Sequence, residues 1–176
     1  MPKILENIKE RAITEARREM LSEGYTAMTV RRVASRLGIG IGTIYNYFPS
    51  KEYLAASVML EDWQARMAAF AQEAAGKDAE ETVRRLYLLV QSFSAVYVLA
   101  WSQYGTSESA GAMRRRYHTA LVEQLSRYIE AALPEEKKVR EPWLAGYLAE
   151  TVLHFASDGE SGYEKIRPAV EQLTKI

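Results

Sequence analysis

Two short stretches of helical spacing, joined by glycines, constrain this chain more than any other feature of its sequence. Thr29 can cap a helix that ends at Gly38, and a second short helix is expected from about Gly42 to Tyr47. The run between them, Leu37-Gly38-Ile39-Gly40, permits a sharp turn. This spacing predicts a helix-turn-helix, a motif whose second helix enters the major groove of DNA.

The second of these helices separates two surfaces. With about 3.6 residues per turn, Ile44 and Phe48 share one face. Thr43, Tyr47 and, less squarely, Asn46 project elsewhere. We expect the first pair to pack in the core and the others to be available for contacts with a ligand.

The rest of the chain also shows helical spacing. The apolar stripe that begins at Ile4 stops at Gly24, and Ser50 can cap a helix that starts at Lys51 and has no breaker before Gly76. Further helices are expected over residues 79–103, 112–133, 142–156 and 163–176, with a solvated connector at 135–141. The helix over 79–103 is apolar nearly all round, so we expect its neighbours to cover it. No strand alternation occurs in the sequence.

These patterns predict an all-α fold with two domains. A three-helix helix-turn-helix head occupies residues 1–50, and a C-terminal helical bundle occupies residues 51–176. A chain of 176 residues with 48% apolar content can bury one sizeable core and a small satellite domain.

Composition excludes several classes of function. The sequence has no cysteine, so it has no disulfide framework, thiolate nucleophile or cysteine-ligated zinc, and it suits a reducing compartment. The N-terminus is charged every few residues and the apolar run Leu86–Trp101 is broken by polar residues, so neither resembles a signal peptide or a membrane span. We expect a soluble, cytoplasmic protein without membrane contact.

The zero net charge hides an asymmetry. Residues 1–51 hold nine Lys and Arg and five Glu, a charge of +4, whereas residues 52–176 hold fourteen Lys and Arg and eighteen Asp and Glu, a charge of −4. A basic N-terminal third suggests a surface that binds a polyanion.

The segment "TVRRVASRLGIGIGTIYNYFPSKEYL", residues 29–54, resembles the N-terminal domain of the TetR family of transcriptional repressors. The resemblance covers roughly residues 5–60 and is centred on "GTIYNYFPSKEYL". It implies that Thr29 and Lys51 contact phosphates, that Thr43 and Tyr45 face bases and phosphates, and that Tyr47 hydrogen-bonds a phosphate.

The sequence departs from the family pattern at two places. Gly40 and Ile41 stand where relatives often have polar residues, and Ile41 can contact only a thymine methyl. Arg32 replaces an acidic capping-box residue and, with Arg31 and Arg36, adds positive charge. The predicted DNA contacts are Thr29, Arg31, Arg32, Ile41, Gly42, Thr43, Tyr45, Asn46, Tyr47 and Lys51.

Other interpretations of these residues stay open. The three arginines can form an ordinary solvated helix face, and Tyr45 can be a packed aromatic side chain. A second basic cluster, Met113 to His118, is interpreted as a solvated helix start rather than a second polyanion site. His118 and His154 are too few for a metal centre, so we predict neither a metal nor a cofactor.

Aromatic residues with a few polar neighbours predict a small-molecule pocket in the C-terminal domain. The resemblance implies an effector there, which the aromatic lining suggests is aromatic or lipophilic. Core packing is the alternative for each residue. The predicted lining is Trp63, Tyr87, Gln91, Phe93, Ser94, Tyr97, Trp101, Tyr104, Tyr117 and Tyr147.

The resemblance further implies a homodimer formed through the helices around 112–133 and 142–156, bound to a palindromic double-stranded operator. The strip of Ala145, Gly146 and Ala149 would allow close helix approach, although packing within one chain can also explain it. The implied mechanism is repression that ends when an effector shifts the helix beginning at Lys51. No Ser/His/Asp set, HExxH motif or phosphate loop favours an enzyme. The alternative is a helical ligand-binding or partner-docking module without specific DNA binding.

Overall fold

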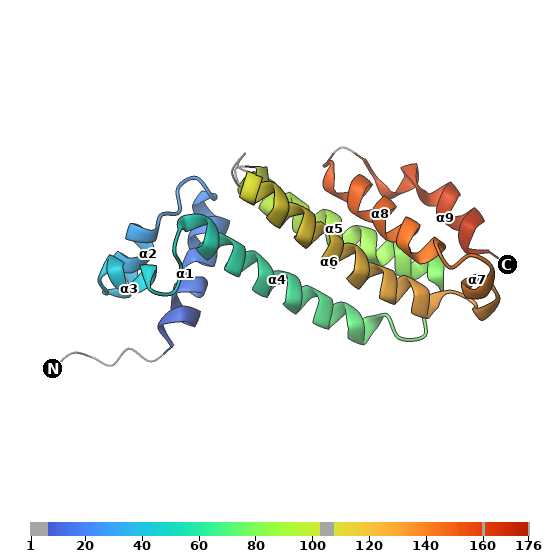
Figure 1. Ribbon diagram of the computed structural model, residues 1–176, viewed down its shortest axis with the longest axis horizontal. Helices are drawn as coiled ribbons and strands as arrows, with labels where there is room; N and C mark the ends of the chain where they lie inside the picture. Colours follow the sequence, from blue (N-terminus) through green and yellow to red (C-terminus); the bar gives the residue numbers. More distant parts are fainter. Residues whose placement is uncertain (1–6, 103–107, 160, 176) are drawn as a thin grey trace. The chain divides into compact units, whose positions relative to one another are not determined.

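A computed structural model describes residues 7–102, 108–159 and 161–175, with the side chains of residues 98–116 outside the description (Figure 1). All of the regular elements within these ranges are helical, which confirms the predicted all-α fold. In chain order they are α1 (Ile8–Glu23), α2 (Val30–Leu37), α3 (Ile41–Tyr45), α4 (Lys51–Glu73), α5 (Ala79–Ser102), α6 (Glu108–Ala132), α7 (Glu135–Arg140), α8 (Leu144–Ser157), the 3-10 helix η1 (Tyr163–Lys165) and α9 (Arg167–Thr174). None of the described helices has both the length and the apolar character needed to cross a bilayer.

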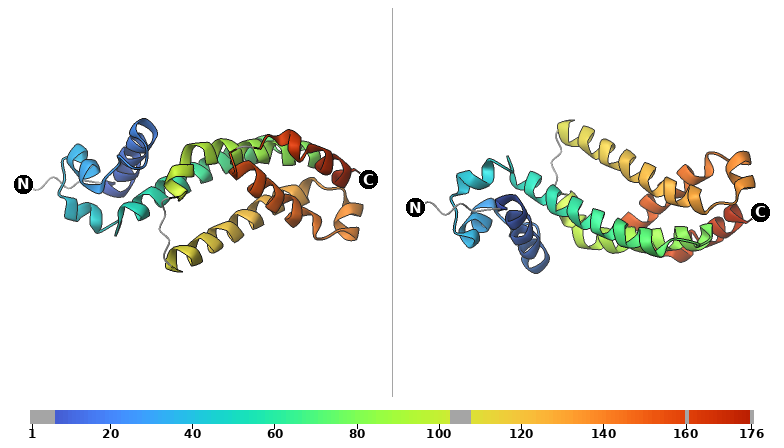
Figure 2. Two further views of the ribbon diagram at one scale, coloured as in Figure 1. Left: turned by 90° about the horizontal axis from the view of Figure 1, so that it is seen from above. Right: turned by 90° about the horizontal axis from the view of Figure 1, so that it is seen from below.

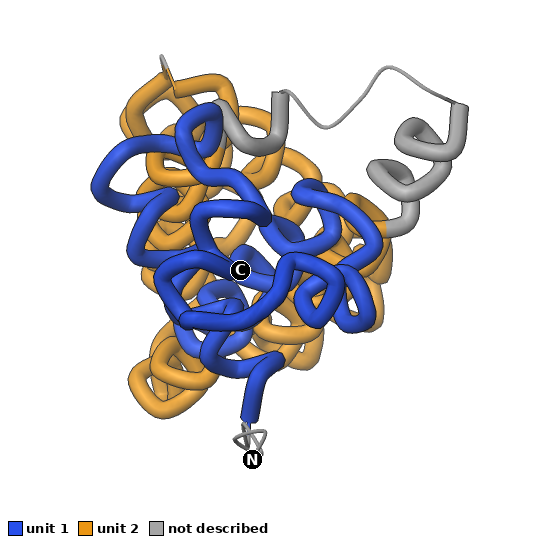
Figure 3. The backbone as a smooth tube through the Cα atoms, turned by 90° about the vertical axis from the view of Figure 1, so that its left-hand side faces the viewer, with its two compact units in different colours: residues 1–67, 99–104 blue, residues 68–98, 105–176 orange. Residues whose placement is uncertain are grey.

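The chain forms two compact units, which are coloured separately in Figure 3. Unit 1 comprises residues 1–67 and 99–104, and unit 2 comprises residues 68–98 and 105–176. The change from unit 1 to unit 2 therefore occurs inside α4 rather than at its start. The functional division at residue 50 stays a prediction.

In unit 1, α1, α2 and α3 pack against one another around a small core. Ala12 and Ala16 of α1, Val33 of α2, and Ile44 and Phe48 at the second short helix are all buried. The two sharp changes of direction occur at glycines with positive φ, Gly24 at 84° and Gly38 at 67°, where a side chain would be strained. These elements form the predicted helix-turn-helix.

In unit 2, α6 packs along α8 (Figure 2). Leu125 and Ile129 of α6 and Leu148 and Val152 of α8 are buried. Tyr87 of α5 is buried as well, and its hydroxyl lies 3.1 Å from the carbonyl oxygen of Phe155 and 2.5 Å from that of Ser161, so the two carbonyls share its single proton. These bonds fix α5 to the end of α8 and to the segment that follows it.

The structure corrects several predicted elements. Residues 135–140 form α7 rather than a connector, because charged pairs three and four residues apart stabilise this turn: Lys138–Glu135, Arg140–Glu136 and Lys137–Glu141. The helix predicted from 142 begins at Leu144, and the segment 163–176 divides into η1 and α9. The helix over 79–103 is covered by its neighbours only in part, since Leu88 and Val96 of α5 are exposed whereas Leu86, Tyr87 and Val90 are buried.

Candidate nucleic-acid interface

The short helix α3 presents two tyrosines to solvent and buries the residues beneath them. Tyr45 and Tyr47 are 47% and 48% exposed, whereas Ile44 and Phe48 are buried. The predicted division of this segment into a packing face and an outer face is therefore confirmed for Ile44, Phe48 and Tyr47. The last helical residue of α3 is Tyr45, so Tyr47 lies just beyond the helix rather than inside it.

The remaining predicted contacts of α3 lie on or near the same outer surface. Ile41 and Gly42 in its first turn and Asn46 after its end are exposed, and Thr43 is half-buried. A Cβ added at Gly42 would meet no atom within 4 Å, so the backbone here is open to approach from outside. These side chains offer a hydroxyl, an amide and an apolar group, which can contact phosphates, base edges and thymine methyls respectively.

Thr29 caps the N-terminus of α2 as predicted. Its backbone is extended, and its side-chain oxygen accepts a hydrogen bond of 3.2 Å from the backbone N–H of Arg32. The exposed Thr29 therefore holds the first turn of α2, where backbone N–H groups and the helix dipole favour an anion.

Lys51, the first residue of α4, is held by the loop between α1 and α2. Its ammonium group donates a hydrogen bond of 3.2 Å to the carbonyl of Thr26 and lies 4.2 Å from the ring centroid of Tyr25. Burial lowers the pKa of Lys51 below its usual value, and the neighbouring Glu52 opposes that shift in part. The lysine is only partly buried, so it can still meet an anion in front of the loop.

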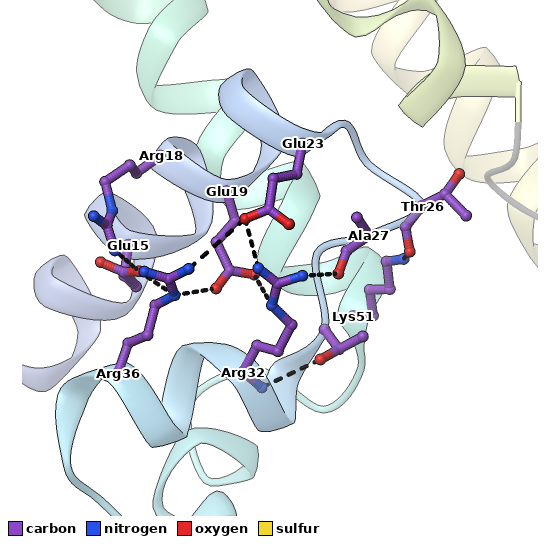
Figure 4. A network of polar contacts seen from close by, with 10 residues as sticks. Glu15, Arg18, Glu19, Glu23, Thr26, Ala27, Arg32, Arg36 and Lys51 are labelled. Atoms are coloured by element: carbon purple, nitrogen blue, oxygen red, sulfur yellow. Dashed lines mark hydrogen bonds and ion pairs between the residues drawn. The ribbon is translucent and has the colours of Figure 1, made fainter.

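The three arginines of α2 differ in their surroundings. Arg31 is exposed, and no described residue pairs with it. Arg32 instead lies 2.6 Å from Glu23 and 3.5 Å from Glu19, and donates to the carbonyl of Ala27 (Figure 4). A direct DNA contact by Arg32 stays a prediction, but its guanidinium is already engaged within the chain.

Arg36 is held in the same way, at 2.9 Å from Glu19, 3.4 Å from Glu15 and 3.7 Å from Glu23. Glu19 is only 1% exposed, and no hydrogen bond of good geometry from a described residue reaches either of its carboxylate oxygens. The short distance to Arg36 is therefore an ion pair with poor hydrogen-bond alignment.

Glu19 is not among the site residues predicted from the sequence. Its signal was the spacing of Glu15, Glu19 and Glu23, four residues apart, opposite the similarly spaced Arg32 and Arg36.

Several residues of the predicted ligand pocket are engaged within the chain. Besides Tyr87, the Gln91 amide donates to the carbonyl of Ser161 at 3.2 Å, and the Ser94 hydroxyl lies 3.3 Å from that of Ser157. These groups connect α5 to the last residue of α8, Ser157, and to Ser161 in the segment that follows it. Their predicted role toward a ligand stays a prediction.

The other predicted lining residues differ in exposure. Trp63 and Tyr97 are buried, Phe93 packs on Tyr97 with ring centroids 4.9 Å apart, and Tyr117 and Tyr147 are exposed. Trp101 and Tyr104 lie outside the described side chains.

The two histidines show no metal site. His118 Nε2 is 3.3 Å from Glu150 Oε2 in an exposed pair between α6 and α8, and the ring of His154 packs on that of Phe155. No cluster of three metal-binding side chains occurs among the described residues.

Comparison with known proteins places this geometry in context. Residues 12–58 match the family model described as "Bacterial regulatory proteins, tetR family". A 41-residue stretch of the chain is 42% identical to the HTH-type transcriptional repressor KstR of Rhodococcus jostii. This stretch makes up 23% of this chain and 19% of that protein. KstR of Mycolicibacterium smegmatis matches at the same identity over 20% of its length, so the chain spans about a fifth of these curated relatives.

Solved structures extend the similarity of fold to nearly the whole chain. Salmonella enterica GusR matches with a TM-score of 0.63 at 18% identity, over 99% of this chain and 100% of that one. A TetR-family regulator from Syntrophomonas wolfei matches with a TM-score of 0.59 at 18% identity, over 94% and 92%. A regulator from Saccharomonospora viridis, solved in complex with choline, matches with a TM-score of 0.51 at 18% identity, over 93% of each chain.

Proposed function

We propose that this chain is a cytoplasmic, dimeric transcriptional repressor of the tetR family of bacterial regulatory proteins, which a small effector releases from its operator, and the match of residues 12–58 to the model of that family supports the proposal. The observation that carries the proposal is the outer surface of α3, where Tyr45 and Tyr47 are exposed above the buried Ile44 and Phe48. The fold itself does not require two exposed aromatic rings here, one at the last residue of α3 and one two residues beyond it, so their exposure needs another reason. Contact with DNA provides one.

The proposed contacts divide by chemistry. Thr29 and Arg31 at the start of α2, with Tyr47 and Lys51 after α3, would bind phosphates and set the orientation of the motif. Thr43, Tyr45 and Asn46 would lie toward base edges, where an asparagine amide can pair with adenine. Ile41 adds only an apolar contact, so most of the hydrogen bonding to bases would come from the second half of the segment.

A homodimer is proposed through α6 and α8. A single helix-turn-helix contacts few base pairs, whereas two related by a two-fold axis contact half-sites about 34 Å apart. Trp143 and Tyr147 are exposed and pack edge to face, with ring centroids 5.8 Å apart, so this side of α8 offers aromatic surface to a second copy. Ala145 and Ala149 are buried within the chain, so of the predicted small-residue strip only Gly146 remains for the partner.

The effector is proposed to act through α4. Within unit 1 this helix is attached to the helix-turn-helix at two places: Lys51 to the loop after α1, and Arg17 of α1 to Asp62 at 2.6 Å and Glu61 at 2.9 Å. A displacement of α4 would therefore move α1 with it. An aromatic or lipophilic effector would shift the population toward the displaced state only by its difference in affinity for the two states.

Fluorescence anisotropy with labelled fragments from upstream of its own gene tests the proposal. A repressor forms a stable, salt-sensitive complex with one short palindrome, and an effector weakens it. Uniform weak binding to all fragments would instead favour the alternative, a helical ligand-binding or partner-docking module. A native mass spectrum of the same sample would report the dimer and any bound small molecule.

A further inference from the structure

We propose that the acidic stripe of α1, centred on Glu19, withholds Arg32 and Arg36 from DNA phosphates and so limits sequence-independent DNA binding. This inference rests on the proposed function, because it concerns the same DNA-binding surface. It makes Glu19 a positioning residue that determines specificity without touching DNA.

The geometry pairs two matched rows of side chains (Figure 4). Glu15, Glu19 and Glu23 are four residues apart and therefore lie along one face of α1, and Arg32 and Arg36 are four apart on α2. Glu19 is within 3.5 Å of Arg32 and 2.9 Å of Arg36, and each arginine has at least one further carboxylate, Glu23 at 2.6 Å from Arg32 and Glu15 at 3.4 Å from Arg36. Both guanidinium groups thus point back to α1.

Stability alone gives a weak reason for a buried carboxylate at position 19. Burying a charge is costly, and a buried ion pair can often be replaced by apolar side chains of similar size without loss of stability. A leucine or methionine would serve the contact between α1 and α2 as well. What Glu19 adds is a fixed location for two positive charges.

The position of these two guanidinium groups matters because the first turn of α2 is proposed to face a DNA phosphate. The backbone N–H of Arg32 is the group that Thr29 caps, so its side chain begins in the helical turn proposed to face a phosphate. The side chains of Arg32 and Arg36 are 38% and 41% exposed, so each can turn outward without disturbing the core. A freed arginine there would bind phosphate through its planar fork, with no preference for base sequence.

The net charge of this cluster of arginines and glutamates supports the same inference. Arg18, which lies 2.6 Å from Glu15, joins Arg32 and Arg36 against the three glutamates, so the cluster is neutral as a whole. The charge of +4 over residues 1–51 therefore resides entirely on the other ionisable residues of that segment. Removing one carboxylate from the cluster adds positive charge directly beside the proposed interface.

The test compares Glu19→Gln with the wild-type chain in binding to the palindromic fragment and to a random duplex, from about 50 to 200 mM salt. Each arginine that reaches a phosphate makes the slope of log association constant against log salt concentration steeper by about 0.9 per helix-turn-helix. Between about 50 and 200 mM salt, this change in slope corresponds to about a threefold additional loss of affinity. We expect Glu19→Gln to bind random DNA more tightly at low salt, with a steeper slope, and to discriminate less between the two fragments. Glu10→Gln removes the same charge from an exposed position on the same helix and is expected to leave slope and discrimination unchanged.

Two further variants keep the result interpretable if Glu19→Gln destabilises the domain. Glu23→Gln removes the exposed partner of Arg32 and should shift the slope in the same direction by a smaller amount. In an Arg32→Gln/Arg36→Gln background, Glu19→Gln should no longer change the slope. Equal slopes for folded Glu19→Gln, Glu23→Gln and Glu10→Gln would overturn the inference while leaving the proposed function intact. Failure of the wild-type chain to bind either duplex would overturn both.

Discussion

The ammonium nitrogen of Lys51 lies 4.2 Å from the centroid of the Tyr25 ring, at the junction between the helix-turn-helix and α4. Its second contact, the carbonyl of Thr26, lies in the same loop. One side chain thus joins the loop after α1 to the first residue of α4, and it carries the positive charge proposed to bind a phosphate. A phosphate contact and a displacement of α4 would therefore act on the same residue.

We expect Lys51→Ala to weaken binding to the palindrome and to random DNA by a similar factor, because a phosphate contact has no base preference. The salt slope should become shallower by about 0.9 per head. Lys51→Arg, which retains the charge, serves as the control in the same anisotropy titrations. An unchanged affinity of Lys51→Ala at low salt would remove this residue from the interface.

Thr29→Ala should destabilise the helix-turn-helix, because it removes the oxygen that accepts the Arg32 N–H. Loss of such a cap typically costs about 1 kcal/mol in the free energy of unfolding. Urea denaturation followed by circular dichroism measures the change. Thr29→Ser keeps the hydroxyl and should retain the wild-type midpoint; a loss equal to that of the alanine variant would exclude the cap as the cause.

Tyr87 and Tyr163 should respond in opposite ways to loss of their hydroxyl groups. The Tyr87 hydroxyl has two carbonyl partners, whereas that of Tyr163 is buried without a hydrogen-bond partner among the described residues, and its pKa is raised by burial to about 12. Tyr87→Phe should lower the free energy of unfolding by about 1–2 kcal/mol, while Tyr163→Phe should leave it unchanged or raise it by about 1 kcal/mol. Calorimetric melting of both variants checks the pair, and equal losses would contradict the assigned bonding.

Glu81 should contribute to acid sensitivity. Hydrogen bonds from Arg84 and Arg85 hold the pKa of Glu81 at about 2, below its ordinary 4.5. Because the folded state binds this proton more weakly than the unfolded state, its stabilising contribution is fully present above pH 4.5 and is lost as the pH falls toward 2. Across this window the free energy of unfolding of Glu81→Gln should fall less steeply than that of the wild type; parallel curves would argue against the pairing.

Tyr147→Glu should dissociate the proposed dimer by placing a charge in an apolar contact between copies. Tyr53→Glu is a matched control, since Tyr53 is 52% exposed on α4 and Tyr147 is 53% exposed on α8. Sedimentation velocity gives the oligomeric state of each. Dimers of equal stability for the two variants would place the interface elsewhere.

The sequence was sufficient where a local pattern determines local structure. Ile44 and Phe48 are buried because they recur on one face of a short helix, and Thr29 caps α2 because its oxygen can reach the N–H three residues ahead. Gly24 and Gly38 stop their helices in the left-handed region of φ, as their type and position indicated.

The sequence was insufficient where the determining contact is distant along the chain. Nothing near Gln91 or Tyr87 indicates that both bind the carbonyl of Ser161, so aromatic and amide groups on α5 suggested a pocket. Glu19 is comparable, since its burial depends on two arginines of the next helix. The prediction of a solvated connector at residues 135–140 was wrong, because dense charge is typical of an exposed loop. Oppositely charged residues at helical spacing also stabilise a helix, which is what this segment forms.

A single titration tests whether the outer surface of α3 contacts DNA. Labelled duplexes carrying the upstream palindrome, or a scrambled version of it, are titrated with the wild-type chain and with Tyr45→Ala, which removes an exposed ring without touching the core. We expect the wild type to bind the palindrome far more tightly than the scrambled duplex, and Tyr45→Ala to lose most of that preference while remaining folded. Equal affinity of the wild type for both duplexes, or a preference that survives in Tyr45→Ala, would contradict the claim.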